Sequence, residues 1–197
     1  MKILLDACVI YPTVMREVLM GAAREGLFQP QWSARILEEW ARAARKLGPE
    51  GETLARGEIV MLRAAWPKAE IQYAPALEDR LWLPDPADTH VLAAAIAGSS
   101  DLILTMNAKD FPRHILHEEG LERLDPDGFL RQLWHDSPEA MARVVEQVRQ
   151  EAERLSGQEW STRALMKKAR LPRLGKALTA RKGWASAPTF RQVVEWL

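Results

Sequence analysis

The sequence is poor in the features that mark secreted or membrane-inserted proteins. It contains one cysteine, Cys8, so no disulfide can form within the chain, which excludes disulfide-stabilised scaffolds. The uncharged stretch over residues 89–100 is much shorter than the roughly 20 apolar residues of a membrane-spanning helix. The apolar N-terminal run is interrupted by Asp6 and shows no signal-peptide pattern. We therefore predict a cytoplasmic protein with no membrane segment.

Two common kinds of chemical site are also missing. No glycine-rich phosphate loop is present, which argues against a nucleotide-binding Rossmann or P-loop protein. Cys8 follows an apolar run and is interpreted as a small core residue rather than a nucleophile. The histidines show no metal-ligand spacing with carboxylates or with Cys8, so we interpret them as structural or exposed. They are His90, His114, His117 and His135.

The net charge is zero, but the two signs are unevenly distributed along the chain. Residues 140–197 hold 12 basic and 5 acidic residues, whereas the rest of the chain holds 15 basic and 22 acidic ones. A basic end of this kind is a candidate nucleic-acid-contacting strip, and a dimer arm fits the same pattern. The candidate contact residues are Arg163, Lys167, Lys168, Arg170, Arg173 and Lys176.

The chain is rich in tryptophan, with eight such residues. We interpret Trp32, Trp40 and Trp82 as core or interface anchors. Trp160 and Trp184 flank the basic strip and could stack on bases, but we favour a role in docking the basic end onto the body of the protein.

Alternating buried strands and helices predict an α/β fold with a mostly parallel sheet. Residues 3–5 and 102–104 are short, fully apolar runs, which is typical of strands buried on both faces. Helical spacing follows Pro12, Ser33 and Asp88, and a last strand is expected over residues 121–124. The character changes at Ser137, where a long helix is predicted to begin. We therefore divide the chain into a domain over residues 1–136 and a helical, basic C-terminal extension over residues 137–197.

Acidic residues gather where the predicted strands and helices meet. Asp6 lies at the carboxyl end of the first strand, and Asn107 and Asp110 follow the strand over residues 102–104. Ligands bind at the carboxyl ends of the strands in open parallel sheets. Asp85 and Asp88 lie at the start of the helix that precedes the strand over residues 102–104. Carboxylates held close together repel one another, and a hard divalent cation such as Mg²⁺ or Mn²⁺ relieves the repulsion. Such a site favours phosphodiester hydrolysis over zinc chemistry.

Each of these residues also has a purely structural interpretation. Asp6 and Asp88 could cap the helices that follow them, and for Asp85 we favour the capping role. Asp110 could be a turn residue. Thr105 could orient a ligand or a water molecule, or cap the next turn. No single carboxylate is a strong signal, whereas their combination is.

Two segments near the N-terminus resemble motifs of PIN domains. Residues 3–9 resemble the opening strand of the family, in which the aspartate, here Asp6, is the first metal ligand. Residues 32–40 resemble the second motif, a serine followed by a helix that carries a glutamate. Matching that serine to Ser33 puts the acid at Glu39, with Glu38 as the alternative.

Two later segments resemble the remaining motifs. Residues 83–95 resemble the third, whose ligand would be Asp88, with Asp85 as a supporting acid. Residues 104–111 resemble the fourth, in which Asn107 stands where many members have aspartate. The family also uses an Asn-x-x-Asp-Phe form, so Asp110 can substitute. The similarity extends over about residues 1–134.

The resemblance implies a three-layer α/β/α fold and a metal-dependent ribonuclease. Asp6, Glu39 and Asp88 would be catalytic and would hold Mg²⁺ or Mn²⁺, together with Asn107 or Asp110. The resemblance is closest to bacterial PIN proteins related to VapC-type toxins, which implies cleavage of single-stranded RNA. An antitoxin protein and a second copy of the chain are the candidate protein partners.

The main alternative is a PIN scaffold that binds RNA or a protein without cutting, which Asn107 favours. A phosphotransfer receiver or an aspartate-nucleophile phosphatase also suits a strand-end aspartate, but Asp6-Ala7-Cys8 lacks the second aspartate of the phosphatases.

Overall fold

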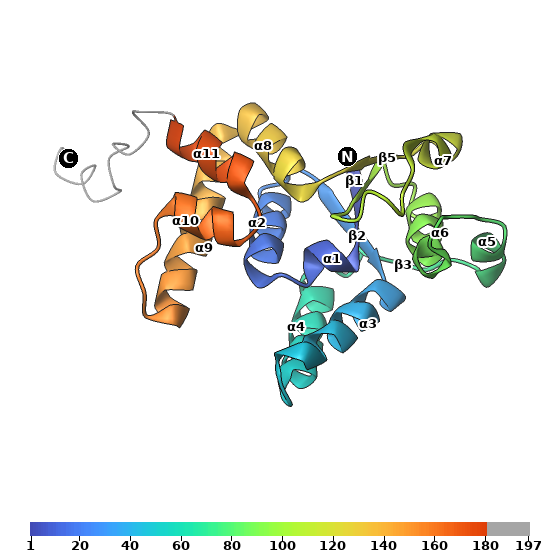
Figure 1. Cartoon of the computed structure of the whole chain (residues 1–197), viewed down its shortest axis with the longest axis horizontal. Coiled ribbons are helices and arrows are strands. Elements are labelled where there is room, and N and C mark those ends of the chain that lie inside the picture. Colours follow the sequence, from blue (N-terminus) through green and yellow to red (C-terminus); the bar gives the residue numbers. More distant parts are fainter. Residues whose placement is uncertain (181–197) are drawn as a thin grey trace.

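The computed structural model describes residues 1–180, and these fold around a five-stranded parallel sheet (Figure 1). The strand order is β3-β2-β1-β4-β5, and every neighbouring pair is parallel. This confirms the predicted α/β class with a parallel sheet. The strands are β1 Lys2–Leu5, β2 Gln29–Ser33, β3 Glu70–Ile71, β4 Leu102–Leu104 and β5 Glu122–Leu124.

The strand β2 was not predicted, because its sequence is polar and contains a proline. Gln29 donates its backbone N–H to Met1 on the β1 side of the strand, and Trp32 donates to Ala69 on the β3 side. Because backbone groups alternate between the two sides, Pro30 faces the same side as Trp32. Only Trp32 and Ser33 pair with β3, so the missing N–H of Pro30 lies where no partner strand needs it.

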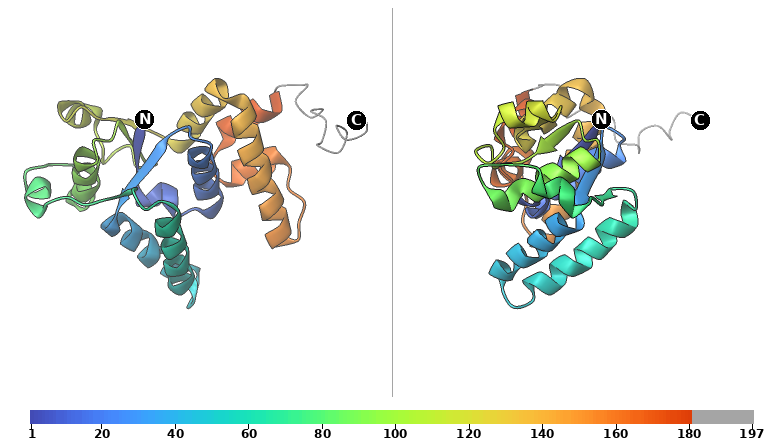
Figure 2. Two further views of the ribbon diagram at one scale, coloured as in Figure 1. Left: turned by 180° about the vertical axis from the view of Figure 1, so that it is seen from behind. Right: turned by 90° about the vertical axis from the view of Figure 1, so that its right-hand side faces the viewer.

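Helices cover both faces of the sheet (Figures 1 and 2). On one side α6 contacts β1, β2 and β4, and on the other α2 lies between the sheet and α9. The helices predicted after Pro12, Ser33 and Asp88 are confirmed as α2, α3 and α6, whereas the short helix α1 directly after Asp6 was not predicted. The helices are α1 Ala7–Ile10, α2 Thr13–Arg24, α3 Ala34–Ala43, α4 Gly51–Ala65, α5 Pro75–Asp79, α6 Thr89–Ala97, α7 Arg113–Glu118, α8 Pro126–Asp136, α9 Pro138–Ser156, α10 Thr162–Lys168 and α11 Pro172–Ala180, with single-turn 3₁₀ helices η1 Ala44–Leu47 and η2 Pro86–Asp88.

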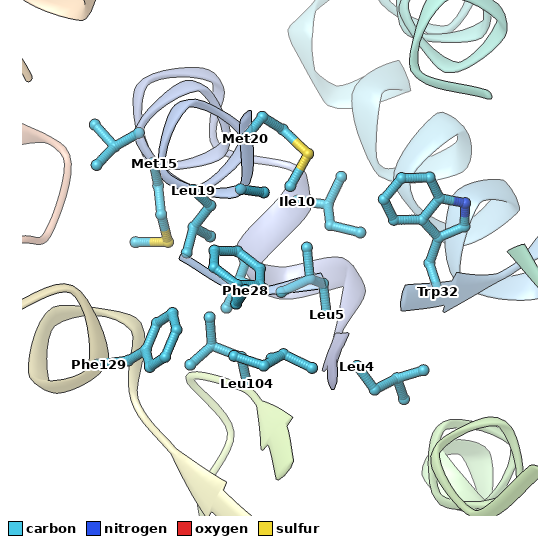
Figure 3. Packing of buried hydrophobic residues seen from close by; sticks show 14 of the residues in the cluster. Leu4, Leu5, Ile10, Met15, Leu19, Met20, Phe28, Trp32, Leu104 and Phe129 are labelled. Atoms are coloured by element: carbon cyan, nitrogen blue, oxygen red, sulfur yellow. The ribbon is translucent and has the colours of Figure 1, made fainter. Parts of the chain in front are cut away.

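The core is continuous from the sheet into the C-terminal helices. Leu4 and Leu5 of β1 are fully buried and leave the strand in opposite directions, as alternate strand residues do (Figure 3). The ring of Phe28 meets that of Phe129 from α8 edge to face, with their centroids 5.3 Å apart. The helices after the sheet are therefore joined to the core around the sheet by buried apolar contacts as well as by the chain.

The C-terminal helices α9, α10 and α11 lie at one end of the molecule, and α5, α6 and α7 lie at the other (Figures 1 and 2). The predicted helix after Ser137 is confirmed as α9, which ends at Gly157 in the left-handed conformation that favours glycine. In the part of the chain that the structure describes, no helix combines the length and the apolar character needed to cross a lipid bilayer.

Candidate metal centre

The strand order reverses at β1, so the carboxyl ends of β1 and β4 lie next to each other. The chain runs from β1 outward to β2 and β3, then returns to place β4 on the other side of β1. In open parallel sheets, ligands bind where the strand order reverses in this way. Asp6 directly follows β1 and Thr105 directly follows β4. The backbone N–H of Asp6 still bonds to Leu104, so these two residues stay side by side.

The Asp6 carboxylate is held from β4 instead of capping the helix after it. Its Oδ2 atom accepts hydrogen bonds from Thr105 Oγ1 at 2.6 Å and from Cys8 Sγ at 3.0 Å. Asp6 is the N-terminal flanking residue of α1, but its side chain makes no capping bond, and the residue is only 7% exposed. The structure therefore disfavours the simple capping interpretation. The fixed carboxylate is instead oriented by Thr105.

Cys8 lies beside Asp6 as a neutral thiol. Its sulfur accepts a hydrogen bond from the backbone N–H of Met106 in addition to donating to Asp6. Burial, followed by the negative charge of Asp6, raises the pKa of the Cys8 thiol to about 12. Because the thiolate is the reactive form of cysteine, this environment agrees with the interpretation of Cys8 as a packing residue.

Three further carboxylates converge on the same edge. Oxygen atoms of Asp85, Asp88 and Asp110 lie within 4.8 Å of one another. Asp85 accepts a bond from the backbone N–H of Ala87 at 2.9 Å, which is the capping role expected for it. The side chain of Asp88 makes no capping bond. Burial first, and then the charges of Asp6, Asp85 and Asp110, raise the pKa of Asp88 from 3.8 to about 6.

This raised pKa predicts that Asp88→Asn stabilises the metal-free protein at neutral pH. In the unfolded chain Asp88 ionises near pH 3.8, whereas in the folded chain it keeps its proton up to about pH 6. The stability that the bound proton contributes is therefore present below about pH 4 and is lost as the pH rises through 6. Asparagine does not ionise, so it avoids the loss.

The measurement is thermal unfolding of both proteins in EDTA. At pH 7.5 we expect Asp88→Asn to melt about 2–4 °C above the wild type, and at pH 4 we expect nearly equal melting temperatures. A difference that stays the same at both pH values would contradict the assigned environment. Mg²⁺ or Mn²⁺ should then stabilise the wild type more than the variant.

The two glutamates of α3 point to different surroundings. Glu38 accepts hydrogen bonds from Arg42 at 3.0 Å and from Arg56 at 2.9 and 3.0 Å. The bonds from Arg56, and then from Arg42, hold its pKa below the usual range. The Glu39 carboxylate instead faces α6, with its Oε1 atom 2.8 Å from Nε2 of His90 and 3.7 Å from Nε of Arg35.

His90 is the group at this edge that sequence reasoning missed. It is fully buried in α6, two residues after Asp88, and neither ring nitrogen has a hydrogen-bond partner within residues 1–180. The Nε2 atom therefore lies at ion-pair distance from Glu39 without hydrogen-bond alignment. His90 follows the predicted acids Asp85 and Asp88 at the start of α6, and this position was the signal available in the sequence. The expectation that His90 is structural or exposed took no account of this contact.

Asn107 and Asp110 are linked to Asp6 by a short series of hydrogen bonds. Thr105 Oγ1 accepts from the backbone N–H of Asn107 at 2.9 Å while it donates to Asp6. The Asn107 amide nitrogen donates to Oδ2 of Asp110. Thr105 thus fills both roles that its position suggested, and Asn107 orients the acid that stands three residues after it.

The six basic residues of the predicted strip lie far from this edge. All six are exposed on or beside α10 and α11, at the opposite end of the molecule from α6 (Figure 1). Arg173 is engaged by Asp125 and Asp127, and Lys168 lies 4.6 Å from the ring of Trp160. These contacts favour the docking role for Trp160. Nucleic-acid binding by the strip stays a prediction, and Trp184 lies outside the described residues.

Comparison with known proteins agrees with the geometry. The family model for the PIN domain matches residues 2–109, which contain β1, β2, β3 and β4. Of the candidate acids, Asp6, Glu38, Glu39, Asp85 and Asp88 lie within the match, and Asp110 follows its last residue. No curated protein and no solved structure matches the chain at a significant level. PIN domains are generally nucleases. Because the match covers more than half of the sequence, the chain belongs to the PIN domain family.

Proposed function

We propose that this protein is a Mg²⁺- or Mn²⁺-dependent endoribonuclease that hydrolyses single-stranded RNA. The reaction would take place at the edge of the sheet that carries Asp6, Asp85, Asp88 and Asp110, which we call the acidic edge. The observation that carries the proposal is the convergence of Asp85, Asp88 and Asp110 within 4.8 Å, beside an oriented Asp6. These residues come from three separate parts of the sequence. A fold that needed them only as helix caps or turn residues would have no reason to bring them together against their mutual repulsion.

The side chains present fit a hard divalent cation. The ligand set is made of carboxylate oxygens, with the amide oxygen of Asn107 nearby, and oxygen ligands of this kind suit Mg²⁺ and Mn²⁺. Burial, and then the charges of Asp6, Asp85 and Asp110, raise the pKa of Asp88, so the acids carry negative charge that a bound cation would offset. When bound, a divalent cation would supply that neutralisation, lower the pKa of a water ligand and offset charge on the reacting phosphate.

The residues of the chain would divide the remaining work. Asp6 and Asp88 would bind the cation directly, and Thr105 would keep Asp6 in its orientation. Glu39 would contribute a carboxylate from α3, and the buried ring of His90 beside it would limit its movement. Asp110 would replace the acid that Asn107 lacks, since Asn107 already holds it in place. Glu38 is occupied by two arginines and is not part of this proposal.

The test is cleavage of a total RNA pool by the purified chain. We expect cleavage with Mg²⁺ or Mn²⁺, complete loss with EDTA, and recovery when the metal is restored. Cleavage that persists in EDTA would contradict the proposal. Titration with Mn²⁺ by calorimetry separates the two candidate functions, because an intact nuclease site binds the ion and a non-catalytic scaffold does not.

The resemblance to VapC-type toxins supports a finer proposal, that this nuclease is the toxin of a toxin–antitoxin pair. A small antitoxin and a second copy of the chain would then be its protein partners. A toxin should arrest growth when it is expressed alone, and its neighbouring open reading frame should encode a protein that restores growth. Arrest that does not depend on the acidic residues would contradict this role.

A further inference from the structure

Trp82 is the residue near the acidic edge whose place differs most from expectation. Of the two roles predicted for it, core or interface anchor, its 66% exposure contradicts the core role, whereas Trp32 and Trp40 are buried. It belongs to the segment between α5 and η2, three residues before Asp85. Three residues span no more than about 11 Å of chain, so the backbone of Trp82 lies within that distance of Asp85.

The segment that carries Trp82 is fixed on both sides. Leu83 is 1% exposed in the core and Leu81 packs against it, so extended alternation turns Trp82 outward. The guanidinium of Arg80 bonds to both carboxylate oxygens of Glu119 at 3.1 and 3.3 Å, which ties the segment to the end of α7. The indole makes no hydrogen bond or ring contact with residues 1–180. A large apolar ring is thus held in water by a well-anchored backbone.

The other side of the acidic group carries positive charge. Lys109 lies between Asn107 and Asp110, and Arg113 opens α7 three residues after Asp110. Both are exposed, and neither forms an ion pair within the described chain. Along the sequence, the acids are therefore flanked by an exposed aromatic ring on one segment and by two cations without an ion-pair partner among residues 1–180 on another.

The geometry points to a nucleobase-stacking site: we infer that Trp82 stacks on a base of single-stranded RNA whose phosphates lie over the acids and against Lys109 and Arg113. Every base has an aromatic face, and single-strand binders combine stacking rings with cations along the backbone. This inference rests on the proposed function and adds the element that would select single strands, since duplex bases are not available for stacking.

The surroundings of Trp82 favour a base over a protein partner. Its neighbours Arg80, Pro84 and Asp85 are exposed, and two of them are charged. One indole of about 150–250 Å² is far from the about 800 Å² that a stable protein interface needs on each side. The other large exposed apolar side chains of residues 1–180 lie before β1 and on η1, α4 and α9; they are Met1, Leu47, Leu54, Val60, Met61 and Leu155.

The experiment measures binding of a fluorescein-labelled single-stranded oligoribonucleotide of about ten nucleotides by anisotropy in Ca²⁺, a hard cation that also takes oxygen ligands and offsets the charge of the acids. Trp82→Ala should weaken binding about 5- to 150-fold, and Trp82→Phe should keep most of the affinity because it keeps a stacking face. The matched control is Leu155→Ala, which removes an equally exposed apolar side chain on α9 and should change nothing. The same sequence as a duplex should bind weakly to all variants.

Salt dependence distinguishes stacking from charge. Trp82→Ala should leave the slope of log affinity against log salt unchanged, whereas Lys109→Ala with Arg113→Ala should reduce it by roughly one per phosphate contact. Wild-type affinity in Trp82→Ala, or an equal loss in Trp82→Phe, would overturn the inference while metal-dependent cleavage stands. A change in sedimentation of Trp82→Ala would overturn it in favour of a self-interface. A wild type that neither binds nor cuts RNA would end both proposals.

Discussion

Replacing Asp6 by asparagine is expected to lower the rate of RNA cleavage about a hundredfold or more while the fold is kept. Asparagine has the size of aspartate, and its carbonyl oxygen can still accept the hydrogen bond from Thr105. It removes the negative charge that a divalent cation requires at this position, and losses of this order follow removal of one preorganised electrostatic group. Because the change also relieves repulsion of Asp88, the thermal stability of the metal-free protein should not fall.

The measurement is the initial rate of cleavage of a single-stranded RNA with Mg²⁺, with circular dichroism and thermal unfolding as checks of the fold. The matched control is Asp136→Asn, the same chemical change at the end of α8, where the carboxylate bonds only to the Gln132 amide at 3.1 and 3.2 Å. It should cut RNA at the wild-type rate. Cleavage by Asp6→Asn at a rate near that of Asp136→Asn would refute the proposed site.

The second large effect is expected at the opposite end of the molecule, where Asp127 anchors α11. Asp127 is 5% exposed on α8, and its two oxygens accept from the backbone N–H groups of Arg173 and Leu174, each at 2.9 Å. It also accepts from Nε of Arg173 at 3.2 Å. The carboxylate therefore caps the N-terminus of a helix from outside it, where its charge complements the helix dipole.

Asp127→Ala should destabilise the docking of α10 and α11 by about 3 kcal/mol, because it leaves two backbone donors without their acceptor and removes one of the two carboxylates that hold the Arg173 guanidinium. The readout is hydrogen exchange, with loss of protection confined to α10 and α11, and RNA cleavage should be unchanged. Asp136→Ala, at the exposed end of the same helix α8, provides the control. Full protection of α11 in Asp127→Ala would show that apolar contacts alone hold the C-terminal helices.

Local sequence signals predicted the acidic edge better than they predicted the sheet. Asp6 and Asp88 directly follow or precede strongly apolar segments, so their places in the fold could be inferred from burial patterns. The strand β2 could not, because Pro30 and two glutamines carry no strand pattern. It is formed by tertiary pairing with β1, which overrides local propensity. The short β3 pairs through only two residues and leaves no pattern to detect.

Side-chain environments were the least predictable part of the site. The choice between Glu38 and Glu39 depends on Arg56, which lies on α4 and is 18 residues from Glu38 in sequence. The burial of His90 follows from an all-apolar stretch of α6, yet its approach to Glu39 needs the placement of α3 against α6. The outward turn of Trp82 depends on which of three consecutive apolar residues face the core. Each of these environments depends on contacts between segments that are far apart in the sequence, so a short stretch of sequence does not predict them.

The bond between Thr105 and Asp6 joins residues 99 positions apart, and it sets the point in synthesis at which this edge of the sheet can form. A ribosome must complete β4 and the loop after it before the edge can assemble, and part of the newest chain is still enclosed at that moment. A nascent chain that ends before this point lacks Thr105, Asn107 and Asp110. The proposed nuclease would therefore be unable to cut its own messenger from a chain of that length.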